Sequence, residues 1–209
     1  MKAIVLSCDK YRALTNHMIY QYDKIWPNNP FRFYIPFQTI DGINSSKIKY
    51  IKSDINIKNT VLTLTNNLDD DEWIYWCIDD KYPIRFILPE VKNIYDWVTT
   101  IQSNKICGIL FCRCRKLLNN NYLSGKIIDD NNNNIFLERN SFDHIWIHQF
   151  LRVKVLRYLF NAFPDKINVA KDMDFFKSAI KLPTDYQLYV SKINYAEFGE
   201  STELMSCKS

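Results

Sequence analysis

The stretch Trp73-Ile74-Tyr75-Trp76-Cys77-Ile78-Asp79-Asp80 places six apolar residues directly before two acids. A continuous apolar run of this length is typical of a strand that is buried on both faces. Carboxylates at the end of a buried strand are costly unless a cation or hydrogen-bond donors compensate them. Mg²⁺ or Mn²⁺ holding a diphosphate meets that need, because these ions share their oxygen ligands between carboxylates, phosphates and water. Asp79 and Asp80 are therefore candidate metal ligands.

The adjacency of the two acids leaves their individual roles open. Neighbouring residues of a regular strand point to opposite faces, so both acids cannot chelate one ion unless the chain turns after Asp79. Otherwise one acid binds the metal while the other contacts a ribose or orients a neighbour. A structural alternative has equal weight: Asp79 and Asp80 begin a following helix, whose N-terminus favours acids.

The rest of the chain predicts an alternation of strands and helices around this stretch. Ala3–Leu6 is a second continuous apolar run, and the spacing of apolar residues predicts a helix over Tyr11–Ile25, ended by Pro27. Further patterns predict strands at 31–35, 48–51, 106–114, 135–137 and 187–195, and helices at 61–68, 88–101, 144–163 and 172–180. This order indicates an α/β sheet with right-handed crossovers. Ligands of such sheets bind beyond the carboxyl ends of the strands.

Composition narrows the class of protein. The 209 residues are 47% hydrophobic and 24% charged, which predicts one globular domain over 1–209 and excludes a disordered or collagen-like chain. The sequence contains no run of 18 apolar residues, so no transmembrane helix is expected. Six cysteines without a C-x-x-C pair, and no signal peptide, favour reduced thiols and a cytoplasmic location. The net charge of +4 is spread along the chain and does not demand nucleic acid.

Three segments together resemble the GT-A type of nucleotide-sugar glycosyltransferase, over about residues 1–115. They are the opening Ala3–Tyr11, the region of Ile25-Trp26-Pro27 and Phe33-Tyr34-Ile35, and the stretch ending in Asp79-Asp80. The family's usual motif is Asp-x-Asp, whereas the acids here are adjacent. A formal Asp69-x-Asp71 precedes the strand and so lies at its wrong end. The small size and the abundance of Asn, Lys and Ile are similar to glycosyltransferase domains encoded by large algal DNA viruses.

The resemblance implies a single-domain GT-A fold, a Rossmann-like mixed sheet flanked by helices. Its nucleotide-sugar half would be residues 1–115, its acceptor half 116–200 and a flexible tail 201–209, and the chain could be part of a longer protein. It also implies that Ser7, Asp9 and Tyr11 line the base and ribose pocket. Lys10 or Arg12 would neutralise phosphate. For Asp9 a structural alternative is an N-cap of the helix that starts at Tyr11.

The second half supplies candidates for the catalytic base and for acceptor binding. An inverting transferase needs a carboxylate that takes the proton of the attacking hydroxyl. Asp143, before the predicted long helix, and Asp172 are the first candidates, with an N-cap as the alternative for Asp143; their rivals are Asp174, Glu197 and Glu200. His148 is the candidate acceptor-binding residue. His144 and His148 would share a helical face, but Ile145 stands where a zinc protease has its glutamate.

These expectations combine into one leading function. The chain would transfer a hexose or 6-deoxyhexose, with glucose or rhamnose favoured, from a nucleoside-diphosphate sugar to a glycan hydroxyl. The donor would be UDP-linked, the cofactor Mn²⁺ or Mg²⁺, and the protein a monomer or weak dimer without a nucleic-acid partner. The alternatives are a nucleic-acid-binding module that stacks bases on its aromatics, an inactive glycan-binding module and a metal-dependent phosphohydrolase.

Overall fold

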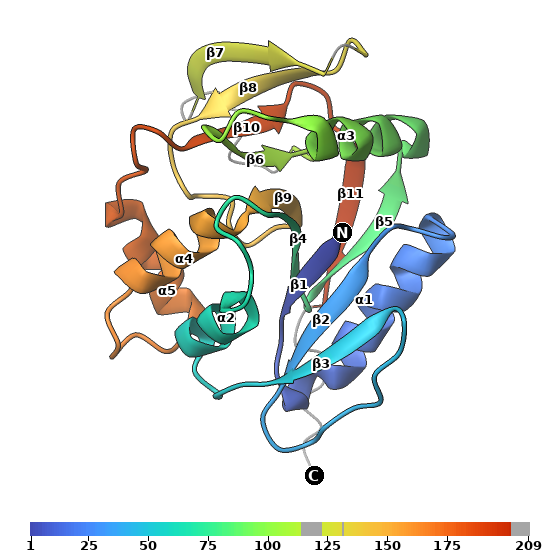
Figure 1. Ribbon diagram of the computed structural model, residues 1–209, viewed down its shortest axis with the longest axis vertical. Coiled ribbons are helices and arrows are strands. Elements are labelled where there is room, and N and C mark those ends of the chain that lie inside the picture. Colours follow the sequence, from blue (N-terminus) through green and yellow to red (C-terminus); the bar gives the residue numbers. More distant parts are fainter. Residues whose placement is uncertain (114–122, 131, 202–209) are drawn as a thin grey trace.

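The computed structural model of the chain describes residues 1–113, 123–130 and 132–201 (Figure 1). The strands are β1 (Lys2–Leu6), β2 (Arg32–Phe37), β3 (Ile48–Lys52), β4 (Trp73–Ile78), β5 (Lys81–Phe86), β6 (Ile106–Leu110), β7 (Leu123–Asp129), β8 (Ile135–Arg139), β9 (Gln149–Arg152), β10 (Gln187–Ser191) and β11 (Ala196–Glu200). The helices are α1 (Arg12–Ile25), α2 (Ile57–Thr65), α3 (Leu88–Thr100), α4 (Val153–Ala162) and α5 (Ala170–Phe176), with the 3-10 turns η1 (Asp9–Tyr11) and η3 (Lys177–Ala179).

A nine-stranded mixed sheet forms the centre of the described structure, in the order β3-β2-β1-β4-β9-β6-β10-β8-β7. The first four strands in this order are parallel, as expected where helices form the crossovers between them. Strand β9 runs antiparallel to both of its neighbours, β4 and β6. Strands β5 and β11 form a separate antiparallel pair. The predicted mixed α/β sheet flanked by helices is confirmed.

Both faces of the sheet are covered, which explains the continuous apolar runs. In β1, Ala3 and Val5 belong to one core cluster and Ile4 and Leu6 to the other, and β4 alternates in the same way. Figure 1 shows α2, α4 and α5 on one side of the sheet. Helices α1 and α3 and the β5–β11 pair lie on the other side. Because both faces of β1 and β4 are dry, their polar ends mark the edge at which a ligand can meet the sheet.

The predicted helix over 144–163 is wrong in its first half. Residues 149–152 form β9, every one of them buried, and the helix α4 begins only at Val153. The apolar residues of this segment fit a helical period, but insertion between β4 and β6 satisfies their backbone groups as a strand. Tertiary pairing therefore overrides the local period. His144 and His148 do not share a helical face.

Other boundaries also differ from the prediction. Strand β5 begins directly after Asp80, so the alternative in which the two acids start a helix is wrong. Pro83 lies within β5, which is tolerated because that strand belongs to a two-stranded pair. The terminal strand expected over 187–195 ends at Ser191 as β10, and a separate strand, β11, begins at Ala196. The helix expected over 172–180 begins at Ala170 and passes into η3. In the described part of the chain, no helix has the length and apolar character needed to cross a membrane.

Candidate active site

A cleft of about 1260 Å³ opens where β1 and β4 end. Leu6 of β1 is aligned with Ile78 of β4, so the residues that follow the two strands leave the sheet at the same edge. Helices α1, α2 and α5 and the end of β11 complete the walls. The polar and charged side chains that line the cleft are Ser7, Lys10, Tyr11, His17, Thr60, Asp79, Asp80, Lys81, Asn168, Lys171, Asp174, Glu200 and Ser201.

Asp79 and Asp80 form the two-residue turn between β4 and β5. The chain thus turns directly after the strand, one of the two arrangements the sequence left open. Among the described residues, Oδ2 of Asp79 and Oδ1 of Asp80 are buried without a hydrogen-bond partner. The pKa of Asp79 is raised to about 7, because burial and the charge of the adjacent Asp80, which raise it, outweigh a hydrogen bond from Ser7, which lowers it. Two desolvated, unsatisfied carboxylate oxygens are the clearest chemical signal in the cleft.

Lys81 and Glu200 lie beside this acidic turn. The Nζ atom of Lys81 is 2.7 Å from Oε1 of Glu200 and 3.8 Å from Oδ1 of Asp80. Burial raises the pKa of Asp80, the Lys81 charge lowers it, and the Glu200 carboxylate raises it. The backbone N–H of Ser201 donates to the carbonyl oxygen of Asp80 at 2.8 Å. The end of β11 therefore brings a third carboxylate to the rim of the same cleft.

Ser7 and Tyr11 line the cleft as expected, on the loop that follows β1. The hydroxyl of Ser7 is buried and lies 2.7 Å from Oγ1 of Thr15 on α1. Lys10 also lines the cleft, with its Nζ atom 5.1 Å from the centre of the Tyr11 ring. These residues bring an aromatic ring and a cation to the lining of the cleft. Their nucleotide-binding role stays a prediction.

Asp9 does not line the cleft and anchors the loop after β2 instead. Its carboxylate accepts hydrogen bonds from the backbone N–H groups of Gln38, Thr39 and Ile40, from the Thr39 hydroxyl, and from Arg12 at 3.2 Å. Although desolvation raises the pKa of Asp9, these hydrogen bonds outweigh it and hold the pKa well below its usual range. Arg12 further donates to the carbonyl oxygen of Ile40 at 2.6 Å. Both side chains are thus engaged in the architecture of the loop.

The prediction that His148 binds an acceptor is wrong. Its side chain is completely buried between the sheet, α1 and β11 and does not line the cleft. Burial lowers the pKa of His148 to about 3, so the imidazole is neutral. A side chain without exposed surface has no atom to offer an acceptor.

The predicted bases Asp143 and Asp172 also lie outside the cleft lining. The Oδ2 atom of Asp143 accepts a hydrogen bond from Ser141 at 2.9 Å within its own loop, and the helix expected to follow it does not form there. Of their rivals, Asp174 and Glu200 line the cleft. Glu197 does not line it and pairs with Arg85 instead. Asp174 pairs with the buried ammonium of Lys177 and keeps about half of its side chain exposed.

The acidic turn fits a divalent cation in its donor chemistry. Two carboxylates with unsatisfied oxygens match the one or two protein ligands that Mg²⁺ or Mn²⁺ takes when phosphate and water complete its shell. No cluster of three or more His, Cys, Asp or Glu side chains suited to a metal occurs within residues 1–113, 123–130 and 132–201. Asp79 and Asp80 would therefore hold the ion together with its substrate rather than in a closed protein cage.

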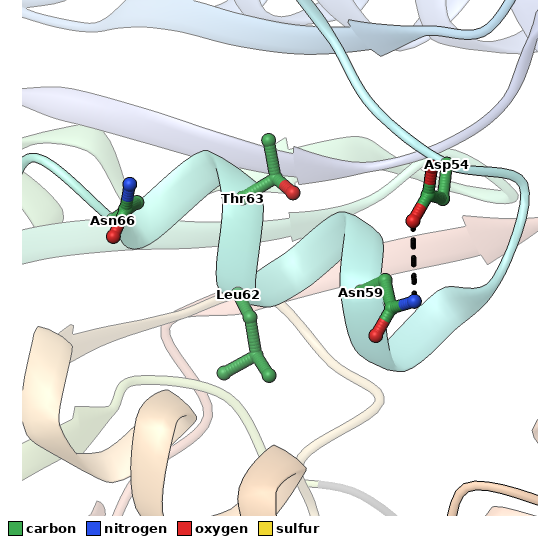
Figure 2. A pocket seen from close by; sticks show the side chains of 5 residues that line it. All are labelled: Asp54, Asn59, Leu62, Thr63 and Asn66. Atoms are coloured by element: carbon green, nitrogen blue, oxygen red, sulfur yellow. Dashed lines mark hydrogen bonds between the residues drawn. The ribbon is translucent and has the colours of Figure 1, made fainter.

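A second hollow, of about 280 Å³, lies along the outer side of α2 (Figure 2). Asp54, Asn59, Leu62, Thr63 and Asn66 line it. Its single carboxylate, that of Asp54, accepts a hydrogen bond from Asn59 at 3.2 Å. Because its acid is already satisfied by a neighbour, this hollow lacks the unsatisfied groups that distinguish the cleft.

Sequence reasoning missed His17, Trp146 and Lys171 as residues of the cleft. Periodicity places His17 within the helix α1, but only the packing of that helix shows that the face carrying His17 borders the cleft. Trp146 lies in the segment predicted as helix, and Lys171 on a helix that follows β4 by about a hundred residues. No local spacing could have connected these positions with Asp79.

Comparisons with known proteins bear on the fold. No protein-family model and no curated protein matches the sequence. The structure of S. aureus TarS 1–349 matches at 10% identity and a TM-score of 0.50, over 93% of this chain and 59% of that one. The structure of the galactosyltransferase LgtC with donor and acceptor sugar analogues matches at 11% identity and a TM-score of 0.46. The match covers 90% of this chain and 67% of that one. A putative glucose-1-phosphate thymidylyltransferase from Bacillus anthracis matches at 11% identity and a TM-score of 0.46, over 96% of this chain and 89% of that one.

The chain has a GT-A glycosyltransferase-like fold, as the sequence resemblance implied. At 10% identity the match to TarS shows a common fold and no more, and the chain spans 59% of that structure. The narrower resemblance to viral domains stays a prediction.

Proposed function

We propose that the chain is a metal-dependent glycosyltransferase that moves a sugar from a nucleoside diphosphate to an acceptor hydroxyl. The observation that carries this proposal is the Asp79–Asp80 turn. It lies at the carboxyl end of a central parallel strand, within a large cleft, and has two buried oxygens without a hydrogen-bond partner among the described residues, one of them 3.8 Å from the ammonium of Lys81. The GT-A-like fold supports a nucleotide-sugar donor for that cleft.

The donor would bind with its diphosphate at the acidic turn and its nucleoside toward Ser7 and Tyr11. Mn²⁺ or Mg²⁺, held by Asp79 and Asp80, would supply positive charge for the departing diphosphate. Lys10, Lys81 and Lys171 line the same cleft and add cationic side chains for the phosphates. A UDP-linked hexose or 6-deoxyhexose remains the proposed donor on the strength of the family resemblance.

The acceptor hydroxyl would enter the cleft near a carboxylate of its lining. In an inverting reaction its oxygen forms a bond to the anomeric carbon while the bond from that carbon to the phosphate oxygen breaks. The hydroxyl proton passes to a carboxylate. Besides Asp79 and Asp80, the acids that line the cleft are Asp174 on α5 and Glu200 at the end of β11, and we propose these two as base candidates in place of Asp143 and Asp172.

Calorimetric titration with UDP and with GDP tests the proposal, in the presence of Mn²⁺ and in the presence of EDTA. We expect one nucleotide to bind only with the metal. Asp80→Asn should weaken that binding about tenfold or more, because hydrogen bonds and contacts to charged groups are worth about 1.5–3 kcal/mol. Asp96→Asn is the matched control, since Asp96 is an exposed carboxylate on α3, away from the cleft lining. It should bind as the wild type does.

Two outcomes would contradict the proposal. Absence of nucleotide binding under every metal condition would exclude a nucleotide-sugar transferase. Metal-dependent nucleotide binding without release of UDP or GDP from any nucleotide sugar, with glycans present, would favour the inactive glycan-binding alternative.

A further inference from the structure

His148 lies at the centre of a buried hydrogen-bond network directly behind the acidic turn. Its Nδ1 atom is 2.6 Å from the hydroxyl of Tyr22, which is 2.8 Å from the hydroxyl of Tyr75. Its Nε2 atom is 3.0 Å from the backbone nitrogen of Ile78 and 2.9 Å from the carbonyl oxygen of the same residue. Ile78 is the last residue of β4 and precedes Asp79.

The position of His148 is where the backbone ladder of β4 ends. The last aligned pair of β4 and β9 is Trp76 and Gln149. The N–H of Asp79 donates to Leu6 of β1, so the N–H and C=O of Ile78 face the opposite, β9 side. Strand β9 begins only at Gln149, and the His148 ring stands where the next backbone partner would be. Because a buried backbone group without a partner is costly, the ring stabilises this end of the strand.

We propose that His148 is a positioning residue that holds the Asp79–Asp80 turn in the cleft by extending the β4 ladder with its side chain. The ring also contacts two other elements that build the cleft. It stacks on Tyr22 of α1, with ring centres 5.9 Å apart, and lies 4.9 Å from Phe198 of β11. The inference rests on the proposed function only in taking Asp79 and Asp80 as the ligand-binding pair.

The network also assigns the protons of His148. With the proton on Nε2, the ring donates to the Ile78 carbonyl, and Nδ1 accepts from the Tyr22 hydroxyl, which accepts from Tyr75. In this arrangement the N–H of Ile78 has no acceptor on the ring. With the proton on Nδ1, Nε2 accepts from the N–H of Ile78, but the hydroxyl hydrogen of Tyr75 and the carbonyl of Ile78 lose their partners in this network. The first arrangement satisfies more groups, and we therefore assign the Nε2–H tautomer from the partners. This tautomer requires a neutral ring, in which Nε2 is the donor and Nδ1 the acceptor.

Amide hydrogen exchange in His148→Leu, His148→Gln and wild type tests the inference without any ligand. In His148→Leu we expect exchange at residues 78–82 to accelerate about tenfold or more, since a buried hydrogen bond is lost. Exchange in α3 should change little. His148→Gln should recover part of the protection, because its amide can donate to the Ile78 carbonyl. If the wild type binds metal and nucleotide, that affinity should follow the same order.

Three results would overturn the inference. They are unchanged exchange at residues 78–82 in His148→Leu, an equal acceleration throughout the molecule, and a ¹⁵N spectrum of the wild type in which Nε2 neither donates nor accepts a hydrogen bond. An Nδ1–H tautomer would overturn the proton assignment alone, because Nε2 would then accept from the N–H of Ile78. The ¹⁵N spectrum decides the matter even if His148→Leu does not fold. If exchange accelerates locally in His148→Leu but the wild type binds no nucleotide, the positioning role is supported and the transferase proposal is contradicted. The failure of one proposal can therefore be distinguished from the failure of the other.

Discussion

At the scale of the residue, Asp79 combines burial, an oxygen without a partner and a pKa raised to about 7. A carboxyl that is harder to ionise in the folded protein than in the unfolded chain destabilises the fold once it is ionised. Its stabilising, protonated form is fully present below pH 3.8 and is lost as the pH rises through about 7. The acidic turn is therefore a place where stability is sacrificed, as is common at binding sites.

Asp79→Asn should make the protein more stable at pH 8 than the wild type. The difference between a pKa of about 7 and the ordinary 3.8 corresponds to roughly 4 kcal/mol when Asp79 is ionised. Even half of that should raise Tm by about 5 °C in a chain of this size. The gain should shrink steadily between pH 7 and pH 4. Metal-free thermal unfolding at these pH values measures it, and a variant that melts below the wild type at pH 8 would contradict the assignment.

At the scale of the element, Asp9 fastens the β2–β3 loop to the end of β1. Three consecutive backbone N–H groups of that loop converge on one carboxylate, which favours the ionised form. The depressed pKa means that this contribution to stability is present above about pH 4 and is lost as the pH falls further. The loop is thus held by charge as well as by geometry.

Asp9→Asn should lower the free energy of unfolding by about 2 kcal/mol at pH 7, because hydrogen bonds to a charged acceptor are weakened. Asp41→Asn is the control, since Asp41 is an exposed acid of the same loop whose side chain accepts a hydrogen bond from the adjacent Gly42. Urea unfolding measures both variants. Equal effects of the two substitutions would show that Asp9 is not the anchor.

At the scale of the whole molecule, β9 joins the two halves of the sheet. It lies between β4 and β6, and its residue Phe150 is completely buried against Phe31, Tyr75 and Phe111. A strand from the second half of the chain is therefore part of the core that holds the parallel strands of the first half.

Phe150→Ala should destabilise the protein by about 3–5 kcal/mol, the usual cost of a cavity left by a buried aromatic. Phe175→Ala is the matched control, because 84% of the Phe175 side chain is exposed, and it should change the stability by no more than about 0.5 kcal/mol. Chemical denaturation measures the pair. A small effect at Phe150 would mean that β9 is not an integral part of the sheet.

The sequence by itself determined the elements whose signal is local. Apolar runs defined β1, β2 and β4, helical spacing defined α1 and α3, and the acids after Ile78 indicated the edge of the sheet that carries the cleft. The sequence contains these signals because both faces of the inner strands are buried, and because the residues of a strand themselves determine where it ends.

Only the tertiary structure decided the partners that come from far along the chain. It made residues 149–152 a strand, because β4 and β6 offered their backbone groups on both sides. It buried the side chain of His148 in the core. It also placed Asp174 and Glu200, rather than Asp143 and Asp172, in the lining of the cleft. Periodicity reports which side of an element is apolar. It does not report which distant element will cover that side, and that pairing sets where a titratable side chain finally lies.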